Sequence, residues 1–231
     1  MGPSVVPILP TARAGAPAVA ARPGRLGDLL AAPSAAAGPL VRPADVGGRA
    51  AWDVLVRDGA LEPVRGDAAV PAGTDVTPAL RAALLAGSLP TGGVLAGRSA
   101  AWVHVGRPAA DHAAGRLDVT YAAGGHRPEV WGAGLVWQAP LLRDDTVELG
   151  RVRVTVPLRT VVDVALHVPD DEAAADLVRL LADDCRVALA DATRLLERRV
   201  RAVGRPRARR VLARAGSLPA VSLRAAAAPL P

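Results

Sequence analysis

Three short segments that alternate between polar and apolar residues, with helical patterns on either side, constrain the fold of this 231-residue chain more than any other feature. Residues 117–121, 135–139 and 151–156 show the period of two that is typical of half-buried strands. In the flanking regions, apolar residues recur at the three- and four-residue intervals that place them on one face of a helix. The sequence therefore predicts an α+β fold. Its core is built mainly from Ala, Val and Leu, because Phe is absent and Met occurs once.

The first third of the chain has the order of elements found in a winged helix-turn-helix. Residues 1–24 are rich in Ala, Pro and Gly without any period, which is typical of a disordered tail. The patterns that follow predict three short helices and a hairpin, over residues 25–31, 44–46, 49–58 and 61–70. Because these elements outline that DNA-binding fold, we assign residues 25–75 to a winged-helix-like domain.

The rest of the chain predicts a mixed α/β domain with a helical C-terminal part, over residues 76–215. Besides the three strands, helical patterns cover residues 77–86, 94–105, 157–166, a segment after Pro169, 187–203 and 207–215. Thr155 can cap the helix whose first turn holds Pro157. Residues 216–231 have no pattern and are expected to be unstructured.

The absence of Lys excludes several classes of enzyme, because all 28 basic residues are Arg. A Walker A phosphate loop and a Schiff-base enzyme both need Lys. The single Cys rules out a disulfide framework and Cys-based metal sites, and it suits a reducing compartment. The four His residues lack the spacing of metal ligands. We therefore expect no catalytic residue, no metal and no cofactor, and a protein that is not an enzyme.

Membrane association is not expected either. No uncharged stretch reaches the ~18–20 residues of a membrane span, and the longest, residues 82–97, is interrupted by Pro and Gly. The N-terminus lacks a basic region and is a poor signal peptide. The sequence thus predicts a soluble cytoplasmic protein with no membrane partner.

The positive charge of the chain lies in its last segment. Residues 194–231 hold ten Arg and one Glu, whereas residues 168–193 hold two Arg and seven acidic residues. The arginines recur at helical spacing and form a stripe: Arg194, Arg198, Arg201, Arg205, Arg207, Arg210 and Arg214. Such a stripe indicates an anionic partner, either DNA phosphate or an acidic protein surface. The alternative is a solvated helix face whose charges pair with the acidic segment.

Three stretches resemble the AbiEi-type antitoxin family of type IV toxin–antitoxin systems, in the actinobacterial form that has no appended nuclease-like domain. The first is the helix and hairpin that hold RDGAL (residues 57–61) and VRG (64–66). The second is VLAGRSAAW (94–102), which is similar to a Ser-Ala-Ala-Trp phrase of the family. The third and most specific is GRVRVTVPLRTVVDVA (150–165). The resemblance covers about residues 40–215.

The resemblance implies a DNA-binding transcriptional regulator with two functions and no cofactor. The family's winged helix binds operator DNA and represses its own operon, and its C-terminal domain counteracts a nucleotidyltransferase-like toxin. Carried over to this chain, the DNA-binding residues are Arg49, Arg57 and Arg65. The family motif consists of Thr155, Pro157, Arg159, Thr160 and Asp163.

Two alternatives remain at this stage. The family's recognition helix is usually crowded with Arg, whereas here Arg49 and Arg57 stand beside Asp53 and Asp58. Because phosphate contacts dominate DNA affinity, the winged helix can also be a relic in a solitary protein-interaction module. The family motif also fits a capped helix with an ion pair between residues 159 and 163, which we favour over direct contact with a partner.

Overall fold

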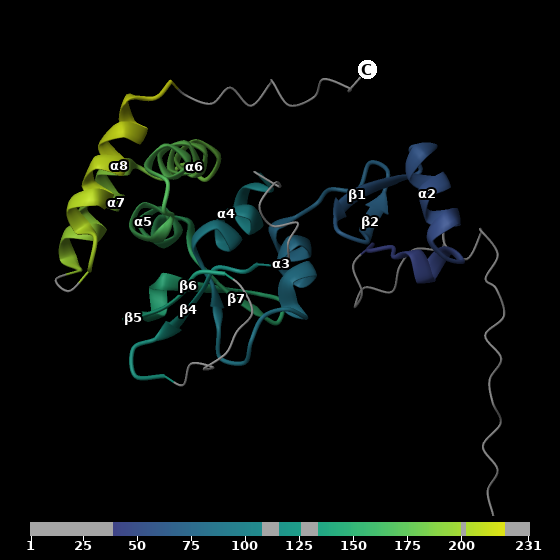
Figure 1. Cartoon of the computed structure of the whole chain (residues 1–231), viewed down its shortest axis with the longest axis horizontal. Coiled ribbons are helices and arrows are strands. Elements are labelled where there is room, and N and C mark those ends of the chain that lie inside the picture. The colour runs from purple at the N-terminus through teal and green to yellow at the C-terminus, as the bar shows by residue number, and fades with distance from the viewer. Residues whose placement is uncertain (1–38, 108–115, 126–133, 200–201, 220–231) are drawn as a thin grey trace, which may run out of the picture. The chain divides into compact units, whose positions relative to one another are not determined.

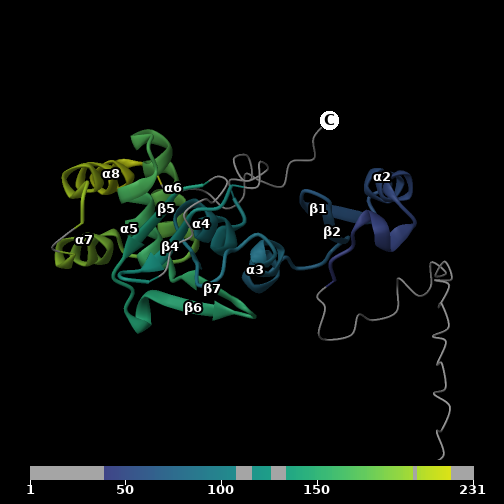
Figure 2. The ribbon, with the colours of Figure 1, turned by 60° about the horizontal axis from the view of Figure 1, so that its bottom comes forward.

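The computed structural model describes residues 39–107, 116–125, 134–199 and 202–219 (Figures 1 and 2). This part of the chain is a mixed α+β structure with seven α-helices and two sheets, which confirms the predicted fold class. The predicted helix over residues 25–31 and the predicted tails, except residues 216–219, lie outside the described residues. Each described helix is too short or too polar to cross a lipid bilayer.

A small helix-and-hairpin unit begins the described chain. Its elements are η1 (Pro43–Val46), α2 (Arg49–Arg57), β1 (Leu61–Arg65) and β2 (Ala68–Pro71). Trp52 on the inner face of α2 is buried against Leu61 and Ala69 of the antiparallel hairpin. Val41 pairs with Ala69 through two backbone hydrogen bonds of 2.8 and 2.9 Å, so the segment before η1 lies beside β2. The predicted turn, helix and hairpin are all present.

The second sheet has five strands in the order β5-β4-β3-β7-β6. Their bounds are β3 (Val94–Leu95), β4 (Val119–Ala122), β5 (Val136–Ala139), β6 (Thr146–Leu149) and β7 (Val152–Thr155). β3 pairs parallel with β7, and β4 pairs parallel with β5, while the other two pairs are antiparallel. The period-two pattern found β4, β5 and β7. It missed β3, which is only two residues long, and β6.

The prediction of one helix over residues 94–105 is wrong in its first part. Val94 and Leu95 form the fully buried central strand, and α4 (Gly97–Val105) begins two residues later. Gly97 makes this change of direction with a φ of +50°, a conformation that side chains with a Cβ rarely adopt. A Cβ there would also lie 2.8 Å from Oδ2 of the buried Asp118. That oxygen accepts a 2.9 Å hydrogen bond from the Arg98 backbone N–H.

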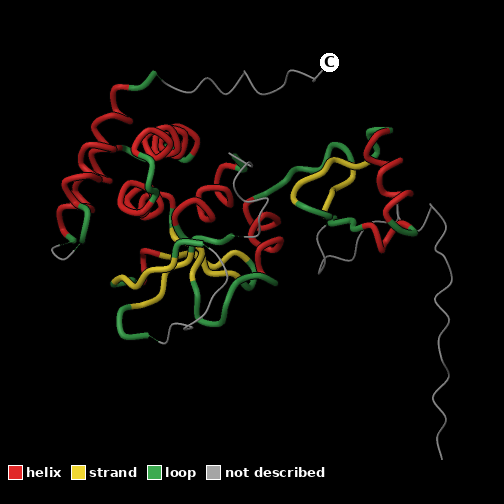
Figure 3. The backbone as a smooth tube through the Cα atoms, viewed as in Figure 1, coloured by secondary structure: helices red, strands yellow, loops and turns green. Residues whose placement is uncertain are grey.

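Helices α4 to α8 gather on one side of the five-stranded sheet (Figures 1 and 3). The remaining bounds are α3 (Pro78–Ala86), α5 (Pro157–His167), α6 (Asp171–Asp184), α7 (Leu189–Arg198) and α8 (Arg205–Ser217). α5 is central because it packs against α4, α6, α7 and α8, and its residues 159–165 are all buried. Thr77 and Asp170 accept backbone hydrogen bonds at the starts of α3 and α6, as N-cap residues do.

The C-terminal helical segment differs from the prediction in its bounds. The helix expected over residues 187–203 ends at Arg198, and the last helix runs from Arg205 to Ser217 rather than over 207–215. Gly204 separates the two with a left-handed φ of 85°, and a proline occupies the first turn of α8. Arg205 therefore belongs to α8, and the arginine row is interrupted between Arg198 and Arg205.

Gly97→Ala should lower the free energy of unfolding by at least about 1 kcal/mol, because it combines an unfavourable φ with a contact on the Asp118 carboxylate. Gly150→Ala is the matched control, since Gly150 has a φ of +64° but open space around its Cβ position. Urea unfolding of both variants measures the difference. Equal losses would contradict the proposed contact with Asp118.

Candidate functional site

The most unusual side chain of the structure is Arg159, which is charged and completely buried on the first turn of α5. Its Nε donates to Asp163 Oδ1 at 2.8 Å, one helical turn further along. Its Nη1 donates to Asp145 Oδ2 at 2.8 Å and to the carbonyl oxygen of Pro140 at 3.1 Å. The ion pair expected from the spacing of residues 159 and 163 is therefore present, inside the protein rather than on a solvated helix face.

Asp145 brings a second arginine to the same point. It ends the short helix η3 (Arg143–Asp145), and its Oδ2 accepts from the Leu142 backbone N–H at 3.0 Å and from Arg199 Nη2 at 3.1 Å. With Arg159, three donors converge on one carboxylate oxygen. The sequence motif did not reveal Asp145 or Arg199, because the two lie 54 residues apart and meet only in the folded chain.

Thr155 and Thr160 tie β7 to α5. Thr155 Oγ1 and Thr160 Oγ1 lie 2.8 Å apart, and Thr160 Oγ1 is also 3.0 Å from the carbonyl oxygens of Thr155 and Val156. The prediction that Thr155 caps α5 is wrong, because the N-cap residue is Val156 and the Thr155 hydroxyl is engaged with Thr160. Pro157 occupies the first turn as predicted.

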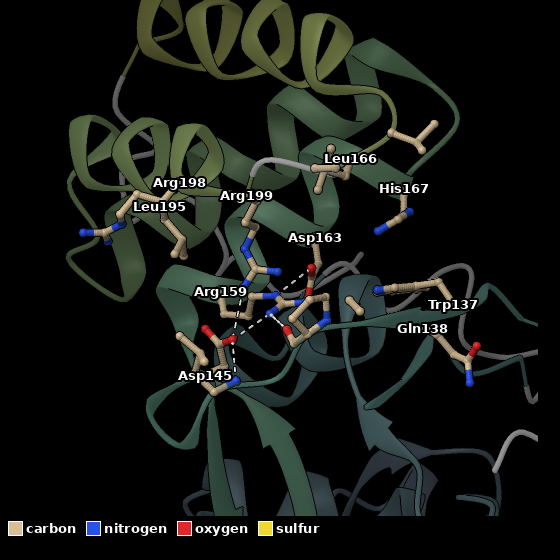
Figure 4. A pocket seen from close by; sticks show the side chains of 15 residues that line it. Trp137, Gln138, Asp145, Arg159, Asp163, Leu166, His167, Leu195, Arg198 and Arg199 are labelled. Carbon is tan, nitrogen blue, oxygen red and sulfur yellow. Dashed lines mark hydrogen bonds and ion pairs between the residues drawn. The ribbon is translucent and has the colours of Figure 1, made fainter. Parts of the chain in front are cut away.

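A cavity of about 700 Å³ lies next to this charge cluster, between β5, α5 and the end of α7 (Figure 4). Figure 4 shows the side chains of Arg159 and Arg199 meeting Asp145 on one side, with Trp137 and His167 on the other. The rest of the lining is mostly apolar. It includes Gln138, Ala139, Pro140, Leu142, Asp163, Leu166, Leu195, Arg198, Ala202 and Val203.

The aromatic side of the cavity carries no charge at neutral pH. Trp137 and His167 stack with their ring centroids 4.2 Å apart. Burial, together with the nearby positive charge of Arg159, lowers the pKa of His167 to about 4. The imidazole is therefore neutral at pH 7 and acts as part of a flat wall. Trp137 itself is buried.

On the charged side, burial raises the pKa of Asp163 to about 6, even though the adjacent Arg159 lowers it. The Asp163 carboxylate is thus close to taking up a proton at neutral pH. A perturbed carboxyl group beside a cavity is a common feature of functional sites.

Several polar atoms in the cavity wall lack hydrogen-bond partners among the described residues. They comprise three donors and one acceptor: Arg159 Nη2, Arg199 Nε, Trp137 Nε1 and Asp163 Oδ2. An unpaired buried polar group costs about 1–3 kcal/mol, so four of them beside one cavity require an explanation.

The three candidate DNA-binding arginines are not equally available. Arg49 donates to Asp53 and Asp67, both at 2.8 Å, and its guanidinium covers Trp52. Arg57 is exposed, 3.5 Å from the carboxylate of the next residue. Arg65 lies 5.3 Å above the ring of Trp102, where burial lowers its pKa. Arg57 is consequently the most accessible of the three.

Three of the seven arginines in the stripe of α7 and α8 pair with acidic residues. Arg207 and Arg214 bridge to Asp171 and Glu172 at the start of α6, and Arg194 bridges to Asp191. Arg205 donates to the carbonyl oxygen of Arg199. Within the described residues, Arg198 and Arg210 are exposed without an ion pair, and Arg201 lies outside those residues. Two of the seven stripe arginines, Arg207 and Arg214, thus join α8 to the start of α6.

The chemistry available at the cavity is recognition by fixed donors. The described residues contain no group of side chains that could hold a metal ion. Burial and the neighbouring Asp184 raise the pKa of Cys185, so its thiol is a weak nucleophile at neutral pH. The hydroxyls of Thr155 and Thr160 are engaged with each other.

No protein-family model matches this sequence, and no curated protein matches it either.

Arg159→Met should destabilise the protein by about 3–5 kcal/mol, because it leaves the buried Asp163 carboxylate without its partner. Arg153→Met is the control, since Arg153 is exposed on β7 and should cost no more than about 0.5 kcal/mol. Urea unfolding at pH 7 measures both. Similar small losses in the two variants would show that the buried ion cluster contributes little.

The stability of the protein should depend on pH through two opposing groups. The pKa of Asp163 is raised in the folded state, so the contribution of this residue to the free energy of unfolding falls as pH rises from about 4 to 6. The pKa of His167 is lowered, so its contribution rises between about pH 4 and 6.5. Each amounts to up to about 3 kcal/mol, and in the unmodified protein the two nearly cancel between pH 4 and 6.

Single variants separate these contributions. Relative to the unmodified protein, His167→Gln should lose stability from pH 4 to 6, and Asp163→Asn should gain stability over the same range. Thermal or urea unfolding at four pH values provides the measurement, and groups common to all three proteins cancel in the differences. A His167→Gln profile parallel to that of the unmodified protein would contradict the low pKa of His167.

Proposed function

We propose that this chain is an antitoxin-like, DNA-binding transcriptional regulator of the cytoplasm. In this proposal residues 25–75 form a winged helix that binds operator DNA and represses the chain's own operon. The domain over residues 76–215 counteracts a nucleotidyltransferase-like toxin and has no catalytic activity of its own. The proposal rests on the resemblance of three sequence stretches to AbiEi-type antitoxins and on the arrangement of the helix-and-hairpin unit.

The observation that carries the DNA-binding half is the pairing of Val41 with Ala69. It places an extended residue before η1 beside the second strand of the hairpin. Along the chain the elements are therefore an extended residue that pairs with the hairpin, a short helix, a longer helix and the hairpin itself. This order is that of a winged helix after its first helix. In such a fold α2 would be the recognition helix, and its exposed residues would face the major groove: Arg49, Ala50, Asp53, Val54 and Arg57.

A second candidate function is favoured by the charges of the same unit. Residues 39–75 hold four Arg and six acidic residues, and both ion pairs of Arg49 keep its guanidinium on the protein. Lys and Arg contacts with phosphate supply most of the affinity for DNA, and this surface offers few. The second candidate is therefore a solitary protein-interaction module with a degenerate winged helix.

Gel-shift titration of the full chain on the DNA upstream of its own gene distinguishes the two candidates. A regulator should bind this DNA specifically, with an affinity that falls steeply as the salt concentration rises. In a plot of the logarithm of the binding constant against the logarithm of the salt concentration, Arg57→Ala should reduce the slope by about 1. Asp67→Asn should strengthen binding, because it frees Arg49 from one of its two carboxylates. Arg151→Ala is the matched control, since Arg151 is an exposed arginine of the β6–β7 turn.

Absence of binding even at low salt would favour the degenerate winged helix.

The toxin half is tested by co-expression with a nucleotidyltransferase-like toxin encoded beside this gene. Arg57→Ala should still rescue growth while losing repression, because the two functions belong to different domains.

A further inference from the structure

The cavity wall has buried hydrogen-bond donors that find no partner among the described residues. Arg159 and Arg199 reach the same Asp145 oxygen at 2.8 and 3.1 Å, so one carboxylate holds two guanidinium groups close together. Each of these arginines has a buried N–H group without a partner among the described residues, and Trp137 Nε1 adds a third such donor. All three residues line the cavity.

A cluster that served only to tie helices together would be expected to satisfy its own polar atoms. Here Arg159 Nη2 and Asp163 Oδ2 both lack a hydrogen bond to any residue that the structure describes, although the two residues form an ion pair through other atoms. Buried polar groups in folded proteins are paired in the great majority of cases. The cluster therefore has the features of a site that is completed by another molecule.

The size and the opposite wall of the cavity define the rest of such a molecule. A volume of about 700 Å³ is typical of sites for small organic ligands. The Trp137 ring and the side chains of Leu142, Leu166 and Leu195 provide apolar surface. The guanidinium of the exposed Arg198 points away from Arg159 and Trp137, so it does not add to the donors of the interior (Figure 4).

We propose that this cavity binds a small organic acid that carries one carboxylate on an apolar body. The carboxylate accepts from the free N–H groups of Arg159 and Arg199, and the body lies against Trp137 and the leucines. Guanidinium groups match carboxylates in charge and geometry. A doubly charged phosphate is disfavoured, because Asp145 and Asp163 share the same wall.

Asp163 can accommodate the added negative charge. Burial already raises its pKa to about 6, and a second carboxylate nearby would raise the pKa further, so the side chain takes up a proton. The protonated carboxyl then donates a hydrogen bond instead of repelling the ligand. This ligand site goes beyond the proposed antitoxin function and does not depend on it.

Isothermal titration calorimetry of the full chain with 2-naphthoate and its neutral isostere 2-naphthamide tests the proposal. The carboxylate should bind at least about tenfold more tightly than the amide, because charge-assisted hydrogen bonds are about twice as strong as neutral ones. It should also bind more tightly than 2-naphthyl phosphate. Equal affinity for acid and amide, tighter binding of the phosphate, or no binding of the acid at millimolar concentration would overturn the proposal.

Three variants locate the site. Arg199→Met keeps an apolar stem and removes the more accessible guanidinium, and it should weaken 2-naphthoate binding at least about tenfold. Ala139→Phe adds bulk to the cavity wall from the edge strand β5 and keeps both arginines in the sequence, and it should abolish binding. Arg151→Met makes the same change of charge on an exposed turn and should leave the affinity unchanged.

Nuclear magnetic resonance spectra of the indole N–H groups show that the variants are folded and report on the site directly. The Trp137 resonance, assigned with Trp137→Phe, should shift when 2-naphthoate binds, because its Nε1 lies in the cavity wall. If Ala139→Phe is folded and still binds, the cavity is not the site. Equal weakening by Arg199→Met and Arg151→Met would show non-specific attraction to positive charge and would likewise overturn the proposal.

Discussion

The burial of Arg159 is the constraint on which the C-terminal part of the structure depends. A guanidinium removed from water needs anionic and carbonyl partners in place, and here they come from α5 itself, from η3 and from the loop after β5. Because Asp145 also binds Arg199, the end of α7 is held to the same point. One buried charge thus fixes the relative positions of a strand end, a short helix and two long helices.

The arginines illustrate how net charge and available charge differ. The chain has a formal charge of +6 and its last segment is the most basic, yet several stripe arginines pair with acidic residues at the start of α6 or in α7. The same holds for Arg49 in the helix-and-hairpin unit. Such surface pairs contribute little to stability individually, but they determine which cations remain free to meet a partner.

Sequence patterns predicted those parts of the fold in which local periodicity and packing agree. The alternation in β4, β5 and β7 and the helical spacing in α2, α3, α5 and α6 identified these elements correctly. β3 escaped because two residues carry no period, and β6 because its alternation covers only four residues, Thr146–Leu149. The boundary between α7 and α8 was misplaced because the arginine row continues across Gly204, where the backbone turns.

The candidate site was predictable only in part, for a similar reason. The i, i+4 spacing of Arg159 and Asp163 indicated an ion pair, because neighbours on a helix meet whatever the rest of the chain does. The spacing could not predict that both residues are completely buried. It also could not predict that Asp145, Arg199 and Trp137 take part, since these three residues come from distant segments. They meet because β5 lies at the edge of the sheet and α7 returns over α5.

The sequence by itself determined the α+β class, the helix-and-hairpin order, the Arg159–Asp163 pair and the absence of Lys chemistry, all of which depend on local spacing or on composition. The tertiary structure decided which arginines are free, which are buried and where the cavity lies. The physical reason is that charge pairing and burial depend on distances in space between residues far apart in the chain, and no local pattern encodes those distances.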